Sequence, residues 1–182
     1  MAKSNRNEHP FDVLAHYEKA SLAHDPGRPE QIDAPGHWRG VAFRLGQRRL
    51  VSGYDEVIEI LHLPAVTPVA GAAPWMLGVA NLRGTLLPVA DLRLFLEGER
   101  TVLHEAQRIL LIRQPGGDVA VLIDELYGQR GFADTQKVEA GELAAGRYSH
   151  FIETAYELGG VTWGVFSMSK LTRTPEFRQA AA

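Results

Sequence analysis

Apolar residues in this sequence gather in short runs that are separated by polar and glycine-rich turns. The densest run covers residues 75–96, WMLGVANLRGTLLPVADLRLFL, and a polar stretch at 81–84 interrupts it. Two buried strands are predicted from the apolar positions on either side, over 76–80 and 86–90. Gly84 tolerates the positive φ that a chain reversal needs, and Asn81 suits a turn. The pattern therefore predicts a β-hairpin with the Arg83 guanidinium at its tip.

The residues after this turn predict a bulged strand and a short helix. Pro88 lacks the N–H that a strand ladder needs, which predicts a bulge or a sheet-edge position for the second strand. Asp91 follows that strand, and its carboxylate suits the N-cap of a helix over 92–97. Gly98 supplies the stop, because glycine readily takes the left-handed conformation that ends helices.

The rest of the chain is mostly β in pattern, with helices at its two ends. Strands are predicted over 40–45, 49–52, 57–61, 108–113, 119–123, 151–158 and 161–166, with loops over 62–74 and 134–146. The first helix is predicted from Pro10 to about residue 24, ahead of a proline- and glycine-rich linker at 25–36. A short terminal helix is predicted over 167–171, followed by a frayed tail at 176–182. Roughly nine or ten short strands in this order indicate a sandwich or small barrels rather than a parallel α/β sheet.

Composition and charge narrow the function classes. The 182 residues carry a formal net charge of -3, which argues against the concentrated basic face that non-specific nucleic-acid binding requires. Cysteine is absent, so disulfides, thiolate chemistry and cysteine-based zinc sites are excluded. The sequence has no run of about 18 uncharged apolar residues and no apolar segment typical of a secretory signal. We therefore expect a cytoplasmic protein with no direct membrane insertion.

The residues that catalysis would use do not form a recognisable pattern. The seven histidines are not spaced as metal ligands, and no GxSxG segment is present. Neighbouring carboxylates such as Asp124 and Glu125 point to opposite faces of a strand, which is a poor arrangement for an acid–base pair. We therefore expect no enzymatic activity, no metal and no cofactor.

Two charged residues in apolar surroundings are candidates for binding. Arg83 carries five donors in a rigid fork, suited to a carboxylate or to several carbonyls of a partner, although a turn arginine is usually a solvated residue. Glu59 lies in the predicted strand 57–61, and strand alternation alone would place it on the solvated face. The other interpretation is that Val57 and Glu59 share that face as part of a partner-binding surface. The residues alone leave both interpretations open.

The segment GVANLRGTLLPVADLRLFL closely resembles the signature of the CheW family of chemotaxis adaptors. Flanking segments agree in their order along the chain: FRLG, EVIEIL, APWMLG, VLIDEL and the closing SKL. The likeness covers residues 38–174, which defines a CheW-like domain between an N-terminal extension at 1–37 and a C-terminal tail at 175–182. The resemblance implies a mostly β fold of two intertwined five-stranded SH3-like barrels, to which the pattern above adds an N-terminal helix and a short C-terminal helix.

The same resemblance implies an adaptor without catalysis. Such adaptors bridge a methyl-accepting chemoreceptor and a CheA-type histidine kinase. They bind the kinase's own CheW-like regulatory domain, and they hold the receptor's cytoplasmic tip in a groove between the barrels. Position by position, the resemblance implies receptor- or kinase-binding roles for Val57, Glu59, Gly78, Asn81, Leu82, Arg83 and Gly84. At Gly78, it implies that a side chain would crowd the groove.

The first 37 residues depart from the plain chemotaxis adaptor, which begins almost directly with its first strand. A helix that starts Pro-Phe, a Pro/Gly linker and a Trp-x-Gly entry to the first strand resemble the PilI branch, which serves the chemosensory system of type IV pili and twitching motility. The alternative within the family is an adaptor of a flagellar chemotaxis array. Outside the family, the alternatives are a small β-barrel enzyme or ligand-binding module, and a nucleic-acid-binding barrel, which the acidic charge balance disfavours.

Overall fold

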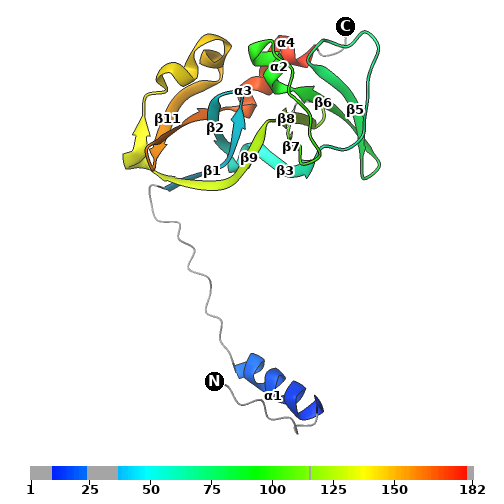
Figure 1. The fold of residues 1–182 in the computed structure, drawn as a ribbon, viewed down its shortest axis with the longest axis vertical. Coiled ribbons are helices and arrows are strands. Elements are labelled where there is room, and N and C mark those ends of the chain that lie inside the picture. The colour runs from blue at the N-terminus through cyan, green and yellow to red at the C-terminus, as the bar shows by residue number, and fades with distance from the viewer. Residues whose placement is uncertain (1–9, 24–36, 115, 180–182) are drawn as a thin grey trace. The chain divides into compact units, whose positions relative to one another are not determined.

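Figure 1 shows the chain as a computed structural model, which describes residues 10–23, 37–114 and 116–179. The chain divides into two units, Met1–Pro35 and Gly36–Ala182. The first unit contains helix α1 (Pro10–Ala23), so the predicted N-terminal helix is confirmed over these residues. The linker predicted over 25–36 lies outside the described residues.

The strands of the second unit form two six-stranded sheets. The first sheet consists of β1 (His37–Leu45), β2 (Arg48–Gly53), β9 (Glu125–Ala133), β10 (Lys137–Val138), β11 (Ile152–Leu158) and β12 (Val161–Phe166), in the order β10-β11-β12-β2-β1-β9. The second consists of β3 (Val57–His62), β4 (Val66–Thr67), β5 (Met76–Leu82), β6 (Thr85–Asp91), β7 (Arg108–Ile112) and β8 (Val119–Ile123), in the order β3-β7-β8-β6-β5-β4. Neighbouring strands are antiparallel except in the parallel β12–β2 and β6–β8 pairs.

Each sheet curls back on itself, because its two outermost strands are neighbours along the chain. Strand β3 ends at His62 and β4 begins at Val66, while β9 ends at Ala133 and β10 begins at Lys137. Such a connection spans at most about 14 Å, whereas the outermost strands of a flat six-stranded sheet would lie about 24 Å apart. The mostly β fold of two β units is confirmed. Each sheet contains six strands rather than five because a two-residue strand, β4 or β10, joins it.

The two sheets are intertwined along the chain. The chain starts the first sheet with β1 and β2, builds all of the second sheet, and returns to the first with β9 to β12 (Figure 1). The connections contain η1 (Tyr54–Glu56), α2 (Leu92–Glu97), η2 (Asp134–Gln136), η3 (Gly141–Ala144) and η4 (Gly146–His150), and α3 (Met168–Arg173) and α4 (Pro175–Arg178) follow the last strand. Helix α3 confirms the predicted terminal helix, and the Ser167 hydroxyl caps it by accepting a hydrogen bond from the Lys170 backbone N–H at 3.3 Å.

One hydrophobic core joins the two sheets. It combines Phe43, Leu50 and Phe166 of the first sheet with Leu110 and Val121 of the second. All five side chains are fully buried. Because burial of each such side chain contributes about 1.5–3 kcal/mol, the two sheets stabilise each other as one body.

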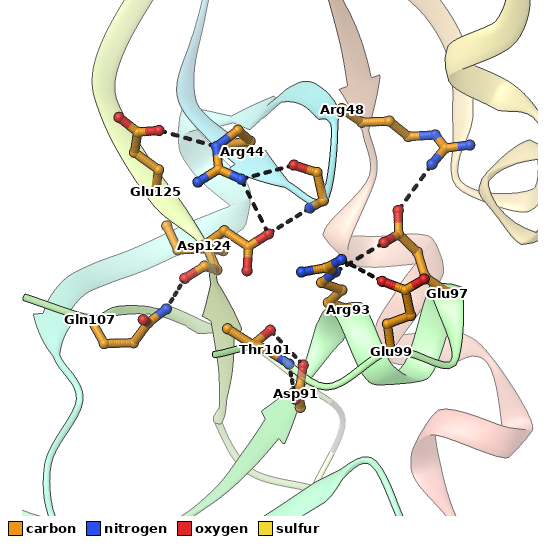
Figure 2. A network of polar contacts seen from close by, with 12 residues as sticks. Arg44, Arg48, Asp91, Arg93, Glu97, Glu99, Thr101, Gln107, Asp124 and Glu125 are labelled. Carbon is orange, nitrogen blue, oxygen red and sulfur yellow. Dashed lines mark hydrogen bonds and ion pairs between the residues drawn. The ribbon is translucent and has the colours of Figure 1, made fainter. Parts of the chain in front are cut away.

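A network of charged side chains links the two sheets beside this core (Figure 2). Glu97, at the end of α2, accepts hydrogen bonds from Arg48 Nη1 at 3.0 Å and from Arg93 Nε at 3.1 Å. The Tyr148 hydroxyl also donates to Glu97, at 3.0 Å, and burial together with this carboxylate raises the pKa of Tyr148. Because Arg48 belongs to β2 and Glu97 follows β6, the network ties the first sheet to the second.

The sequence prediction for the end of β6 is confirmed. Asp91 is buried, and its carboxylate accepts hydrogen bonds from the Leu94 N–H at 3.1 Å and from the Thr101 N–H at 3.0 Å. It therefore caps helix α2 and also fixes the loop that follows the helix. Gly98 ends α2 with a φ of 75°, and its N–H donates to the Leu94 carbonyl at 3.1 Å.

The prediction for Pro88 is confirmed only locally, because Pro88 pairs with β5 on one side and precedes the start of the β8 ladder on the other. Strand β6 lies between β5 and β8 rather than at a sheet edge, and the irregularity in the β5–β6 pairing falls between Met76 and Gly78, on β5. Pairing of β6 with β8 begins at Val89, one residue after Pro88. Pro88 therefore lies beside the end of that ladder, where the missing N–H interrupts the sheet least.

The frayed tail predicted from residue 176 is wrong for its first residues. Phe177, on α4, is 2% exposed and stacks on Trp75 with ring centroids 5.1 Å apart. Its ring also lies nearly perpendicular to the Phe95 ring, with the centroids 5.3 Å apart. A single aromatic side chain that reaches the core anchors this last helical turn, which periodicity over so few residues does not reveal.

Candidate protein-docking surface

The central hairpin reverses through a turn in which two residues take positive φ. Arg83 has a φ of 53° and Gly84 a φ of 87°. Two consecutive residues of this kind form the mirror-image turn whose twist matches that of the flanking strands. The Asn81 side chain completes the turn, because its Oδ1 accepts a hydrogen bond from the Gly84 N–H at 2.9 Å. The sequence predicted positive φ for Gly84 alone.

Arg83 is the one described residue other than glycine that adopts positive φ. This conformation costs a non-glycine residue about 1–3 kcal/mol. Asparagine or glycine commonly occupies this position of a two-residue hairpin turn. The turn therefore places an arginine where backbone energetics disfavours one.

The Arg83 guanidinium forms a two-pronged ion pair with Glu59 of β3. Its Nη2 donates to Glu59 Oε1 at 2.7 Å, and its Nη1 donates to Glu59 Oε2 at 3.2 Å. The Arg83 side chain nevertheless remains 72% exposed, and the Glu59 side chain 32% exposed. The guanidinium is thus held in one orientation while most of its surface faces solvent.

This pair depends on the curl of the second sheet. Strand β3 is separated from the β5–β6 hairpin by β7 and β8. In a flat sheet β3 and β6 would lie about 14 Å apart, too far for the two side chains to form hydrogen bonds at these lengths. The fold therefore brings together Glu59 and Arg83, which the sequence singled out separately. We name Glu59, Asn81, Leu82, Arg83 and Gly84 the turn surface.

Exposed apolar side chains adjoin the hairpin and line β3. Leu86 pairs with Asn81 in the hairpin register and is 65% exposed. On β3, Ile58 and Ile60 are exposed, whereas Val57 is half-buried and packs against the main core. Val57 and Glu59 are thus both half-buried, and a partner-binding role for Val57 stays a prediction.

The sequence pattern did not predict that the two isoleucines are exposed, because strand alternation with Glu59 on the solvated face places them on the buried one. A signal was available: the segment VIEILH is apolar on both faces, and a strand of this kind is normally covered on both sides. Ile58 and Ile60 form the second candidate surface, which we name the β3 outer face. The strand bulges between Val57 and Glu59, where its pairing with β7 shifts register.

Gly78 has a role within the fold. It is buried at the bulge of β5 with a φ of 144°, and a Cβ placed on it would lie 2.7 Å from the Thr67 carbonyl carbon and 2.9 Å from the Pro68 Cα. The crowding expected at this position is therefore against the chain's own β4 segment and not against a partner in a groove. The close approach of β4 to β5 needs a residue without a side chain.

A cavity of about 610 Å³ is lined by the segments that follow β2 and β12 of the first sheet and β7 of the second. Its lining residues are Asp55, Glu56, Arg113, Gln114, Met168, Ser169, Thr172 and Arg173. Glu56 is engaged in capping α3, where it accepts hydrogen bonds from the Ser167 hydroxyl at 2.9 Å and the Ser169 N–H at 3.0 Å. The cavity is therefore a largely polar recess in which one of the two lining carboxylates, Glu56, is already used to cap α3.

The described residues contain neither a cluster that could hold a metal ion nor a helix that could cross a membrane. Nowhere in 10–23, 37–114 and 116–179 do three or more histidine or acidic side chains gather in a way that could hold a metal ion. Among the helices described, none is long and apolar enough to cross a membrane.

Comparison with known proteins identifies the fold and the family. The model of the CheW-like domain matches residues 39–176 of this chain. The chain belongs to the CheW-like family. The signature that suggested this family in the sequence is the segment at 78–96, which forms most of β5, the turn at Arg83 and Gly84, β6 and most of α2.

Relatives of this CheW-like chain differ in how much of it they match. The protein PilI of Pseudomonas aeruginosa is 33% identical over 173 residues, which cover 94% of this chain and 96% of PilI. The protein FrzA of Myxococcus xanthus is 34% identical over 48% of this chain and 55% of its own length. The chemotaxis protein CheW of Thermotoga maritima is 25% identical over 57% of this chain and 68% of its own length.

A solved structure resembles the CheW-like chain in fold. The crystal structure of the scaffolding protein TtCheW from Thermoanaerobacter tengcongensis superimposes with a TM-score of 0.62 at 16% sequence identity. It covers 71% of this chain and 88% of TtCheW. At this identity the likeness establishes the arrangement of strands, while the binding roles assigned to individual residues stay predictions.

Proposed function

We propose that this CheW-like chain is a non-catalytic adaptor that couples a methyl-accepting chemoreceptor to a CheA-type histidine kinase. The observation that carries the proposal is the exposed Arg83 guanidinium, held by Glu59 at the tip of a hairpin. The proposal also draws on the family of the chain and on the scaffolding protein whose fold it shares.

The energetics of the turn support a binding role for Arg83. Its positive φ costs about 1–3 kcal/mol, whereas an exposed ion pair returns about 0–1 kcal/mol. The pair with Glu59 therefore does not explain on grounds of stability why an arginine occupies the turn. A guanidinium held in place for a partner does explain it. Two of its five N–H donors bind Glu59, and the others are available to a carboxylate or to backbone carbonyls.

An adaptor needs separate surfaces for its two partners, and the second sheet offers two candidates. The turn surface is charged and carries the exposed side chain of Leu86 beside it, which suits a polar hairpin with an apolar contact. The β3 outer face exposes Ile58 and Ile60, which suits an apolar patch of a folded domain. We assign the turn surface to the receptor tip and the β3 outer face to the regulatory domain of the kinase.

We further propose that the chain serves the chemosensory system that controls type IV pili and twitching motility. PilI matches 94% of this chain, so about 11 of the 182 residues of this chain lie outside the match. Most of the extension at 1–37 therefore lies within the matched region, whereas the family model begins at residue 39. The proposal places the chain in the cytoplasm, at arrays of membrane-bound receptors.

Co-purification tests the proposal. The full chain, and a variant without residues 1–37, are mixed with the regulatory domain of a candidate kinase and with the cytoplasmic hairpin of a candidate receptor from the same genome. We expect a complex that contains all three proteins, and no complex of kinase and receptor fragments when the chain is omitted. Failure of the full chain to bind either partner contradicts the adaptor role.

A genetic exchange separates the pilus system from the alternative, a flagellar array. Residues 1–37 are replaced by the N-terminus of a flagellar adaptor, and twitching and swimming are measured in the same strain. The proposal predicts a loss of twitching with swimming unchanged. A swimming defect with normal twitching favours the flagellar assignment.

A further inference from the structure

A second cavity, of about 560 Å³, opens where η4 meets α3 and α4. It is lined by Arg147, His150, Phe151, Lys170, Arg173, Thr174, Pro175 and Glu176. Three of these side chains are permanent cations and one is an acid. The cavity belongs to neither the turn surface nor the β3 outer face, and it shares Arg173 with the first cavity.

Two of the three cations already bind carboxylates of the chain itself. Arg147 Nη2 pairs with Glu176 at 2.5 Å, and its guanidinium carbon lies 4.5 Å from the centre of the Phe95 ring. Lys170 pairs with Glu153, and this hydrogen bond lowers the pKa of the Glu153 carboxyl. All four charged side chains of these two pairs are at least two-fifths exposed, so both pairs lie at the solvent boundary.

Arg173 is different, because within the described part of the chain it has no ion-pair partner. It is exposed on the last turn of α3, three residues after Lys170 on the same face of the helix. The chain as a whole carries a formal net charge of -3, so this positive cluster runs against the overall charge. A local excess of positive charge in a recess attracts an anion that the rest of the surface repels.

We propose that this cavity binds an acidic segment of a protein partner through side-chain carboxylates. The pairs Arg147–Glu176 and Lys170–Glu153 show that carboxylates fit these cations, and Arg173 remains available for the first carboxylate of a partner. Because exposed pairs are worth about 0–1 kcal/mol each, a partner's carboxylates replace the internal ones at little cost. Phe151 and Pro175 provide apolar walls for the methylene groups of glutamate side chains. The proposal stands independently of the adaptor role.

The test measures binding of a fluorescent hexaglutamate peptide to the full chain by anisotropy, with a hexaglutamine peptide beside it. Lys170→Gln is the main variant because Lys170 lines this cavity and not the other one, and Arg173→Gln is the second. Arg130→Gln is the matched control, since Arg130 is an exposed arginine of β9 outside the cavity. Thermal unfolding of each variant confirms that the fold is intact.

We expect the chain to bind hexaglutamate and not hexaglutamine, and binding to weaken as salt is added. The double variant Lys170→Gln/Arg173→Gln is expected to bind at least tenfold more weakly, with each single variant weaker than the wild type and Arg130→Gln unchanged. Equal loss in Arg130→Gln, or equal binding of both peptides, overturns the proposal. Complete displacement of the peptide by equimolar inorganic phosphate also overturns it, because the cavity is then a site for small anions.

Discussion

Substitution of Gly78 by alanine is expected to destabilise the second unit of the chain strongly. Gly78 has a φ of 144°, and such backbone geometry costs a residue with a side chain about 1–3 kcal/mol. The new Cβ would also lie 2.7 Å from the Thr67 carbonyl carbon and 2.9 Å from the Pro68 Cα. Because both are backbone atoms, they move only if β4 moves, and overpacking of this kind costs about 1–3 kcal/mol. The total expected loss is about 2–6 kcal/mol.

Gly84→Ala is the matched control for this substitution. Gly84 also has positive φ, at 87°, but a Cβ placed on it meets no atom within 4 Å. Its substitution therefore carries the conformational cost alone, about 1–2 kcal/mol. The difference between the two variants isolates the contact of Gly78 with β4.

Urea unfolding followed by tryptophan fluorescence measures both variants. With a slope of about 2 kcal/mol per molar urea, Gly78→Ala is expected to lower the unfolding midpoint by about 1–3 M. Gly84→Ala is expected to lower it by about 0.5–1 M. A loss for Gly78→Ala no larger than that for Gly84→Ala refutes the argument that β4 excludes a side chain at position 78.

Three further predictions concern stability. Asp91→Ala removes the cap of α2 and leaves the buried Thr101 N–H without its acceptor. We therefore expect the free energy of unfolding, measured in urea, to fall by about 2–4 kcal/mol. A fall below about 1 kcal/mol would contradict this assignment. Phe177→Ala removes the ring that stacks on Trp75, so we expect the free energy of unfolding to fall by about 3 kcal/mol and the tryptophan emission to change. An unchanged melting temperature would mean that α4 does not anchor the core. Arg83→Gln breaks an exposed ion pair, so we expect the free energy of unfolding, measured by calorimetry, to change by less than about 1 kcal/mol. A larger loss would show that the pair stabilises the fold.

Features that depend on neighbours in the chain could be predicted from the sequence. Asp91 caps the helix that follows it, and Gly98 ends that helix, because capping involves atoms only a few residues apart. The hairpin was predictable for the same reason, although the positive φ of Arg83 was not. Its turn type is set by the twist of the paired strands, which residue preferences at that position do not encode.

Features that depend on the curl of the sheets could not be predicted. Glu59 and Arg83 meet because the second sheet bends β3 toward the hairpin, and no local pattern reports this bend. The same curvature brings the two-residue strand β4 against Gly78. The crowding predicted between position 78 and a partner is therefore with the chain's own backbone. The sequence predicts a frayed tail at Phe177, which is buried, because one aromatic residue near a terminus gives no periodic signal.

The affinity of the chain for a receptor's cytoplasmic hairpin, measured by calorimetric titration, tests the docking role of the turn surface most directly. Arg83→Glu is compared with the wild type and with Arg100→Glu, which places the same charge change on an exposed arginine outside the turn surface. Arg83→Glu is expected to weaken binding at least tenfold, or about 1.4 kcal/mol, while Arg100→Glu leaves it within about twofold of the wild type. Unchanged affinity in a well-folded Arg83→Glu variant, or an equal loss in Arg100→Glu, would contradict the assignment of this surface to the receptor.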